Sequence, residues 1–309
     1  MAKILSGKEV AAAISRRTRE KTEALRQQGT VPTLAILRVG QRADDISYER
    51  GAAKRCDSVG IAVRSVILPA DVTQQALMEE LERLNEDRQV HGILMFRPLP
   101  GHLDEEAARQ ALDPAKDVDG ITDASLAGVF TNTEKGFCPC TAQAAMEILD
   151  YYGVDCTGKR AVVVGRSLVV GRPAAMLLLH RNATPTICHT RTENLAELTR
   201  TADIVVVCAG QMEALNASFF RGGQTVIDVG IHYHEEKQKL CGDVDFDSAE
   251  SVVEAITPVP GGVGAVTTSV LAAHVAEAAE RARARGWKSD EICDRSDEEC
   301  SVSEYHRGD

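Results

Sequence analysis

The sequence predicts an α/β protein with two domains, each a parallel sheet with crossover helices. The chain has 309 residues, which is long for one ordinary α/β unit and suits two domains. Apolar β-rich runs alternate with amphipathic helical patterns from end to end, as expected for parallel strands joined by helices. No internal repeat of solenoid length is present, so a repeat architecture is not expected.

The first half is predicted to form three helix–strand pairs. Helices are expected at residues 8–28, 44–59 and 73–86, and strands at residues 33–39, 61–68 and 92–96. Two prolines within Arg97–Gly101 cannot continue a central strand, so that segment is predicted to be a loop.

The second half is predicted to start again near residue 140. A helix is expected at residues 142–152, and strands at 160–165, 184–188, 204–208 and 225–229. A closing helix, Leu271–Arg285, could pack back on the first half. We therefore assign residues 1–140, closed by the helical segment 266–285, to a first domain and residues 141–265 to a second.

The charge of the chain is negative and uneven. The formal net charge is −11 and the pI about 5.3, so non-specific nucleic-acid binding is disfavoured. Aromatic residues make up only 4%, which argues against an aromatic platform for sugars or single-stranded nucleic acid. Eight acidic and three basic residues fall within 287–309, which we predict to be a flexible, solvated tail rather than a docking element.

The cysteines and the apolar runs favour a cytoplasmic protein. Nine cysteines are scattered through apolar segments, which is typical of reduced thiols. Cys138-Pro139-Cys140 is too short for a CxxC pair, and His232-x-His234 is expected to be a loop, so no metal site is predicted. No run approaches the roughly 18 apolar residues that span a bilayer, and the N-terminus lacks a signal-peptide core.

The turn Gly165-Arg166-Ser167 is the strongest local signal for a ligand. It follows a buried-looking strand and opens a helix. A glycine there lets the backbone approach a phosphate, and the helix N-terminus supplies N–H donors. The run Val164–Gly171 is not a strict GxGxxG, so a plain strand–helix turn is the alternative.

Thr190 and Arg191 follow the next strand, where a dinucleotide-binding unit meets the adenosine ribose. NAD enzymes often place an acid there, whereas NADP enzymes place a basic residue. No acid occurs before Glu193, and Arg166, Thr190 and Arg191 could bind a 2′-phosphate. The alternative is that Arg191 is a solvated residue at a helix start.

Two further motifs have unusual compositions. Pro258–Gly264 holds three glycines and two prolines, which is more typical of a loop against a ligand than of a hinge. The aspartates of Lys116–Gly120 could bind a metal or hydrogen-bond a heterocycle, but the run supplies few acids for a metal. Its spacing alone equally fits an exposed turn.

Together these runs resemble the methylenetetrahydrofolate dehydrogenase/methenyltetrahydrofolate cyclohydrolase (FolD-type) family. The resemblance covers about residues 4 to 280 and leaves out the acidic tail. The matching runs occur in family order and are Pro32–Gly40, Tyr48, Cys56-x-x-x-Gly60-Ile61, Gly92–Leu94, Pro98–Pro100, Lys116–Gly120, Pro139–Thr141, Val163–Gly171, Asp228–Ile231, Gly242–Asp245 and Ile256–Gly264.

The resemblance implies an N-terminal catalytic domain, a Rossmann-type NAD(P)-binding domain, a folate cleft between them, and a homodimer. It implies oxidation of 5,10-methylenetetrahydrofolate by hydride transfer to a nicotinamide cofactor. Arg166 and Arg191 favour NADP over NAD as that cofactor. It also implies roles for single residues. On the folate side, Tyr48 would orient the rings and Asp119 would accept hydrogen bonds from the amino-pyrimidine edge, and the loop residues that would border the folate are Pro260, Gly261 and Gly262. On the cofactor side, Ile231 would approach the nicotinamide. The residues that would hold the phosphates and ribose are Gly165, Arg166, Ser167 and Thr190.

Two departures from the family pattern concern the cyclohydrolase residues, and Asp45 and Ala265-Val266 depart from it elsewhere. The family's helix reads Tyr-Val-x-x-Lys-x-Lys, and its first lysine is the cyclohydrolase residue. Ala52 occupies that place here, and Lys54 matches the second, non-catalytic lysine. The glutamine that partners the catalytic lysine is replaced by Phe96. We therefore expect cyclohydrolase activity to be absent or weak.

Two alternatives to this monofunctional dehydrogenase stay open. One is the usual bifunctional enzyme, with Lys54 or Arg97 substituting for the missing groups. The other is a non-catalytic paralogue that binds folate or NADP.

Overall fold

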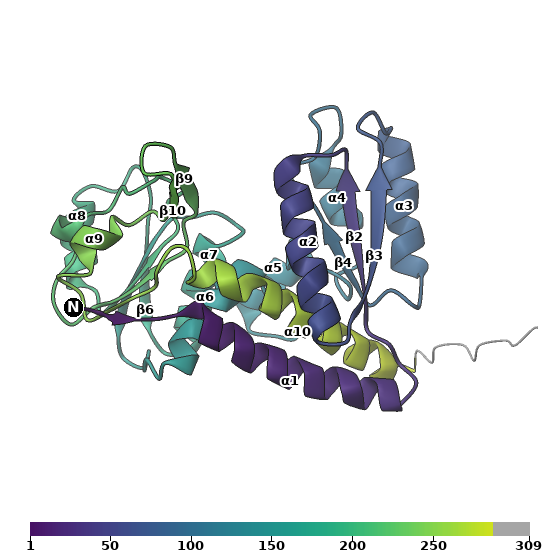
Figure 1. Cartoon of the computed structure of the whole chain (residues 1–309), viewed down its shortest axis with the longest axis horizontal. Coiled ribbons are helices and arrows are strands. Elements are labelled where there is room, and N and C mark those ends of the chain that lie inside the picture. The colour runs from purple at the N-terminus through teal and green to yellow at the C-terminus, as the bar shows by residue number, and fades with distance from the viewer. Residues whose placement is uncertain (287–309) are drawn as a thin grey trace, which may run out of the picture.

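A computed structural model, which describes residues 1–286, consists of two α/β lobes joined by two long helices (Figure 1). The prediction of two α/β domains with parallel sheets is confirmed. The acidic segment 287–309 lies outside the described residues, so its character stays a prediction. Between residues 1 and 286 no helix is both long and apolar enough to cross a membrane.

The first lobe is a three-stranded parallel sheet in the order β3-β2-β4. Leu34 and Ile36 of its central strand face the core shared with the long helices, whereas Ala35 and Leu37 face the outer helices. The elements are β2 (Thr33–Val39), α2 (Ala43–Ser58), β3 (Ala62–Leu68), α3 (Gln74–Glu86), β4 (Gly92–Met95) and α4 (Glu105–Ala111).

The second lobe is a six-stranded parallel sheet in the order β1-β11-β8-β7-β5-β6. The chain leaves β5 toward β6 on one side and then returns to β7 on the other. Ligands of open α/β sheets bind outside the carboxyl ends of the strands at such a switch point. The elements are β1 (Lys3–Ile4), β5 (Arg160–Val164), α7 (Gly171–His180), β6 (Thr184–Cys188), α8 (Leu195–Thr201), β7 (Ile204–Val207), η1 (Ala217–Phe219), β8 (Thr225–Asp228), α9 (Phe246–Ala249) and β11 (Ala255–Ile256).

The N-terminal residues depart from the predicted domain division. Strand β1 pairs with β11, Lys3 lying opposite Ala255, so the chain begins in the sheet of the second lobe. A two-residue strand carries no local pattern, and only its distant partner defines it.

Several predicted elements differ from the structure. The strands expected at 33–39 and 184–188 match β2 and β6, and most other ends shift by one or two residues. Helices α4 and α5 (Asp123–Thr131) were not predicted. His232-x-His234 is not a loop: it forms β9 (His232–His234), which pairs antiparallel with β10 (Lys239–Cys241) because the chain turns back between them.

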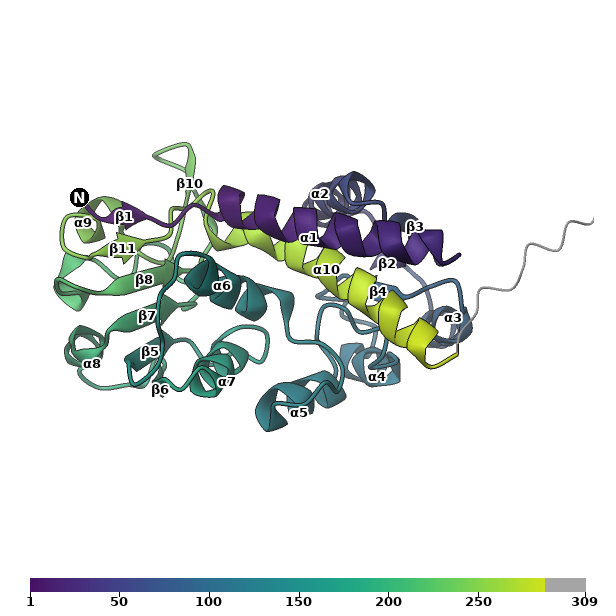
Figure 2. The ribbon, with the colours of Figure 1, turned by 90° about the horizontal axis from the view of Figure 1, so that it is seen from below.

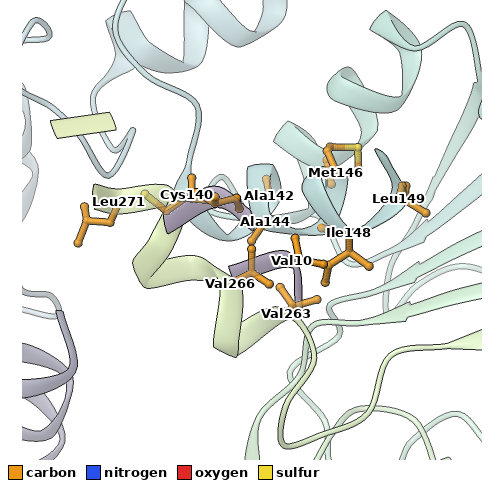
Figure 3. Packing of buried hydrophobic residues seen from close by; sticks show 14 of the residues in the cluster. Val10, Cys140, Ala142, Ala144, Met146, Ile148, Leu149, Val263, Val266 and Leu271 are labelled. Atoms are coloured by element: carbon orange, nitrogen blue, oxygen red, sulfur yellow. The ribbon is translucent and has the colours of Figure 1, made fainter. Parts of the chain in front are cut away.

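Helices α1 (Gly7–Gln27) and α10 (Val263–Ala284) lie side by side and run from the second lobe to the first (Figures 1 and 2). They pack with α6 (Cys140–Tyr151), and Figure 3 shows Val263 and Val266 of α10 near Val10 of α1 and Ala144 of α6. These residues are small and fully or almost fully buried, so the three helices can approach closely. The expected closing helix begins at Val263 rather than Leu271, and its Leu271 and Val275 share a core with Leu34 and Ile36 of the first lobe.

Candidate active site

Tyr48 lies on α2 and contacts Phe96, which follows β4. Their ring centroids are 5.7 Å apart and their planes meet at 84°. Ala52, one helical turn after Tyr48, is fully buried, whereas Lys54 is exposed. The side chains at the two positions that we expected to be substituted are therefore apolar, and neither carries a group that could exchange a proton.

Asp119 lies close enough to Tyr48 for its charge to act on the Tyr48 hydroxyl. Burial, and then the charge of Asp117, raises the pKa of the Asp119 carboxyl, whereas Arg97 and Cys140 lower it, and the net pKa is about 6. The whole Tyr48 residue is 37% exposed, but its hydroxyl group is largely buried. Burial, and then the charge of Asp119, raises the pKa of that hydroxyl far above its usual range, so it stays protonated at neutral pH.

The Lys116–Gly120 motif divides into structural and site residues. Lys116 donates from Nζ to the carbonyls of Leu84 and Asp87, at 2.9 and 2.7 Å. Asp117 is fully buried and accepts the backbone N–H groups of residues 121 and 122 and the Ser125 hydroxyl. Both residues therefore fix the loop, whereas the charge of Asp119 acts on the Tyr48 hydroxyl.

Cys140 and His274 both contact the backbone of this loop at Val118. Neither contact could be predicted from the sequence. The Cys140 thiol donates to the Val118 carbonyl at 3.2 Å, and His274 Nδ1 lies 2.9 Å from the same oxygen. Burial raises the pKa of Cys140 well above its usual value, so its thiol is protonated. The only signal was the Pro139–Thr141 run, which assigned Cys140 no role.

Gly165 opens the turn after β5 in a conformation that few side chains could adopt. Its φ is +137°, and a Cβ built on it would lie 2.3 Å from the Cys208 carbonyl oxygen. The Ser167 hydroxyl accepts the Val170 N–H at 3.1 Å, and α7 begins at Gly171. A glycine turn, exposed side chains at Arg166 and Ser167 and a following helix N-terminus suit the phosphates of a dinucleotide.

Thr190 and Arg191 lie exposed just beyond the end of β6, which pairs with β5 up to Val164 and Cys188. The turns after these two strands therefore lie at the same sheet edge. Within residues 1–286, neither Arg166 nor Arg191 forms an ion pair through its side chain, so both guanidinium groups remain available to a phosphate.

The glycine-rich loop lies where the two lobes meet. Gly261 has a φ of +101°, and its carbonyl accepts the Gly7 N–H at 2.8 Å. The expected loop extends to Gly264, but Val263 and Gly264 belong to the first turn of α10. Ile231 is 58% exposed, and its Cδ1 lies 3.5 Å from a Cβ built on Gly264. The structure therefore brings the residue expected at the nicotinamide next to the loop expected at the folate.

Sequence reasoning also gave no role to Asp228 and Asp243. The Asp228 carboxylate accepts the backbone N–H groups of Gly230, Asp243 and Val244 at 3.0 to 3.1 Å, while burial raises its pKa to about 7. Both residues belong to runs that match the family, but their separation in the sequence gives no sign that they lie together.

In the described part of the chain no group of three His, Cys, Asp or Glu residues is placed to hold a metal.

Two family models match this chain. The model described as tetrahydrofolate dehydrogenase/cyclohydrolase, catalytic domain, matches residues 5–119, and the NAD(P)-binding domain of the same family matches residues 139–283. The chain belongs to the FolD family. It therefore has the family's N-terminal catalytic domain and C-terminal NAD(P)-binding domain.

Curated relatives and solved structures of the same family also resemble this chain. The chain is 48% identical to the bifunctional protein FolD of Carboxydothermus hydrogenoformans and 47% identical to that of Clostridium kluyveri, over 91% and 90% of this chain and 98% of each relative. It superposes on the bifunctional FolD of Campylobacter jejuni with a TM-score of 0.88 at 36% identity, covering 91% of this chain and 99% of that one. The Trypanosoma brucei dehydrogenase-cyclohydrolase, solved with NADP and an inhibitor, gives 0.85 at 38%, covering 91% and 98%.

Proposed function

We propose that this protein oxidises 5,10-methylenetetrahydrofolate to 5,10-methenyltetrahydrofolate in one-carbon metabolism, with NADP⁺ as hydride acceptor. The observation that carries the proposal is the approach of Ile231 to the start of α10, beside the loop Pro260–Gly262. Family membership and the names of the relatives support the same substrate class.

Hydride transfer requires alignment more than acid–base chemistry. The folate N5 and N10 lone pairs stabilise the cation that forms as the hydride leaves with its electron pair, and NADP⁺, when bound, accepts that hydride. The protein's part is to orient the donor carbon and exclude water. Tyr48 and Phe96 provide an apolar wall, and Asp119 accepts N–H donors of the amino-pyrimidine edge.

NADP is proposed over NAD because Arg166 and Arg191 are exposed and Thr190 adds a hydroxyl. A guanidinium suits the 2′-phosphate because it can form charge-assisted, bidentate hydrogen bonds. The Trypanosoma brucei relative crystallised with NADP supports this choice.

Hydrolysis of the methenyl product is the second candidate activity. The relatives are named bifunctional, which favours this activity over the monofunctional enzyme that we expected from Ala52 and Phe96. This step needs a water to be activated and a proton to be moved. We propose that Lys54 or Arg97 supplies part of this proton transfer and water activation.

The protein is further proposed to be a homodimer in the cytoplasm. Light scattering of the purified protein measures the mass of the assembly and so tests the dimer.

One assay tests the two activities together: the absorbance of reduced nicotinamide and that of methenyltetrahydrofolate are followed in the same reaction. Equal rates of appearance indicate the dehydrogenase alone, and loss of the methenyl signal beyond its uncatalysed decay indicates hydrolysis. Binding of folate or NADP⁺ without either signal would identify a non-catalytic paralogue and overturn the proposal.

A further inference from the structure

A buried carboxylate, Asp243, joins two loops at the edge of the nucleotide-binding sheet. Its Oδ2 accepts the Gly210 N–H at 3.0 Å, and its Oδ1 accepts the Gln211 N–H at 2.9 Å. The ring of His232 makes the third contact, with Nε2 2.8 Å from Oδ1. Asp243 is fully buried, so these contacts replace the water it has lost.

The two loops belong to neighbouring strands. Gly210 and Gln211 follow β7, and His232 follows β8, which pairs with β7 in parallel. Both loops therefore lie at the carboxyl edge, where nucleotides bind. The fit is tight, because a Cβ built on Gly230 would lie 2.4 Å from the Asp243 carboxylate.

The proton on this contact can be assigned from the partners. Backbone N–H groups already donate to both oxygens of Asp243, and a carboxylate can only accept. His232 therefore donates from Nε2. His232 stands directly after Ile231, so the bond also fixes the backbone that presents the Ile231 side chain.

The bond lies at the first residue of the short strand β9. This strand pairs with β10 in a separate two-stranded sheet and takes no part in the six-stranded sheet. Two strands alone are marginally stable. The other histidine of the strand, His234, lies 3.8 Å from Glu213, a longer contact that does not involve Asp243.

We propose that His232 is a positioning residue for the nicotinamide end of the cofactor site. Through Asp243 it holds the Ile231 backbone and the Gly210–Gln211 loop in the arrangement that receives the nicotinamide. This inference rests on the proposed function, because the nicotinamide contact of Ile231 belongs to that proposal.

The test compares four variants of the full chain. His232→Ala removes the bond, and His232→Asn keeps a polar side chain too short to reach Asp243. His232→Gln places its amide nitrogen near the position of Nε2. His234→Ala is the matched control on the same strand. NADP⁺ binding is measured by calorimetry without folate, beside KM for each substrate, kcat and the melting temperature.

We expect the Ala and Asn variants to weaken NADP⁺ binding about tenfold, with the folate KM within twofold of wild type. Gln should restore binding to within about threefold, and the His234 variant should match wild type. Unchanged NADP⁺ binding in the Asn variant, or equal loss for both substrates, would overturn the proposal. A wild type that binds NADP⁺ without turning over folate would instead contradict the proposed function.

Discussion

The ring of Tyr48 meets the ring of Phe96 edge to face, with centroids 5.7 Å apart. Such aromatic pairs contribute about 0.5–1.5 kcal/mol beyond the area they bury. Phe96 stands where we expected the family's glutamine, and Ala52 is buried one helical turn after Tyr48. Neither Phe96 nor Ala52 can carry a charge, and the carboxyl whose charge acts on the Tyr48 hydroxyl is that of Asp119.

Gly165→Ala should abolish most NADP⁺ binding. The added Cβ would lie 2.3 Å from the Cys208 carbonyl oxygen, and the φ of +137° is strained for any side chain. We expect at least a tenfold weaker NADP⁺ affinity and about 1–3 kcal/mol lower free energy of unfolding. Calorimetry and urea unfolding measure the two effects.

Gly158→Ala is the control for backbone strain alone. Its φ is +71°, and nothing lies within 4 Å of the built Cβ, so it should cost about 1 kcal/mol and leave NADP⁺ affinity unchanged. Normal NADP⁺ binding by Gly165→Ala would remove Gly165 from the cofactor site.

Asp119→Asn should stabilise the protein at high pH and weaken folate binding. The folded pKa of about 6 lies above the ordinary 3.8, so ionisation costs stability as pH rises from about 4 to 6. The variant escapes this cost, so it should gain about 1–3 kcal/mol at pH 8 and almost nothing near pH 4. Urea unfolding at both pH values measures the gain.

Asp117→Asn provides the contrast. Asp117 is buried and already accepts three hydrogen bonds, so its replacement should destabilise the protein at pH 8 by about 1–3 kcal/mol. Equal effects of the two substitutions would show that Asp119 is held as Asp117 is, and does not face the site. The folate KM should rise for Asp119→Asn.

Arg166→Ala and Arg191→Ala should each lower kcat/KM for NADP about ten- to a hundredfold, with little change for NAD. The reason is the loss of a charge-assisted hydrogen bond to the 2′-phosphate, worth about 1.5–3 kcal/mol. Steady-state kinetics with both cofactors measure the change, and Arg88→Ala, exposed in the other lobe, is the control. A wild type that uses NAD as well as NADP would contradict the assignment.

Elements with a strong local pattern could be predicted from the sequence. Strand β2 is apolar and β-rich, and its bounds were found without error. The start of α10 at Val263 could not be predicted, because it lies within the Gly- and Pro-rich run Pro258–Gly264, whose composition favours a loop. Strand β1 was missed because two residues define no periodicity, and its partner Ala255 lies at the far end of the chain.

The candidate site shows the same division. Gly165 belongs to a local motif with a known chemistry, whereas Tyr48 and Asp119 were given roles only by the family resemblance. The contact of His232 with Asp243, and that of Cys140 with Val118, could not be found, because each depends on how separate loops fold together. Side-chain hydrogen bonds between distant residues leave no spacing to detect.

The double substitution Ala52→Lys/Phe96→Gln should raise the rate of methenyl hydrolysis. It introduces an ionisable group on the face of α2 that carries Tyr48, since residues four apart share a helix face, and a polar side chain at the position of Phe96. A positioned acid or base typically contributes roughly 10²–10⁴-fold, so we expect at least a tenfold faster decay than with wild type. Decay of methenyltetrahydrofolate absorbance, with and without enzyme, measures the rate.

Lys54→Ala then shows whether the wild type has a substitute for that lysine. Lys54 is six residues from Tyr48, so it points about 120° away on a regular helix, and it is exposed. To act on the folate it would need the helix to bend, which Gly51 permits because a glycine weakens a helix. If wild type accelerates decay and Lys54→Ala removes the acceleration, Lys54 is the substitute that the bifunctional alternative requires. If the acceleration survives, Lys54 is excluded and Arg97→Ala is the next variant to test, because Arg97 lies near enough to Asp119 to lower the pKa of its carboxyl.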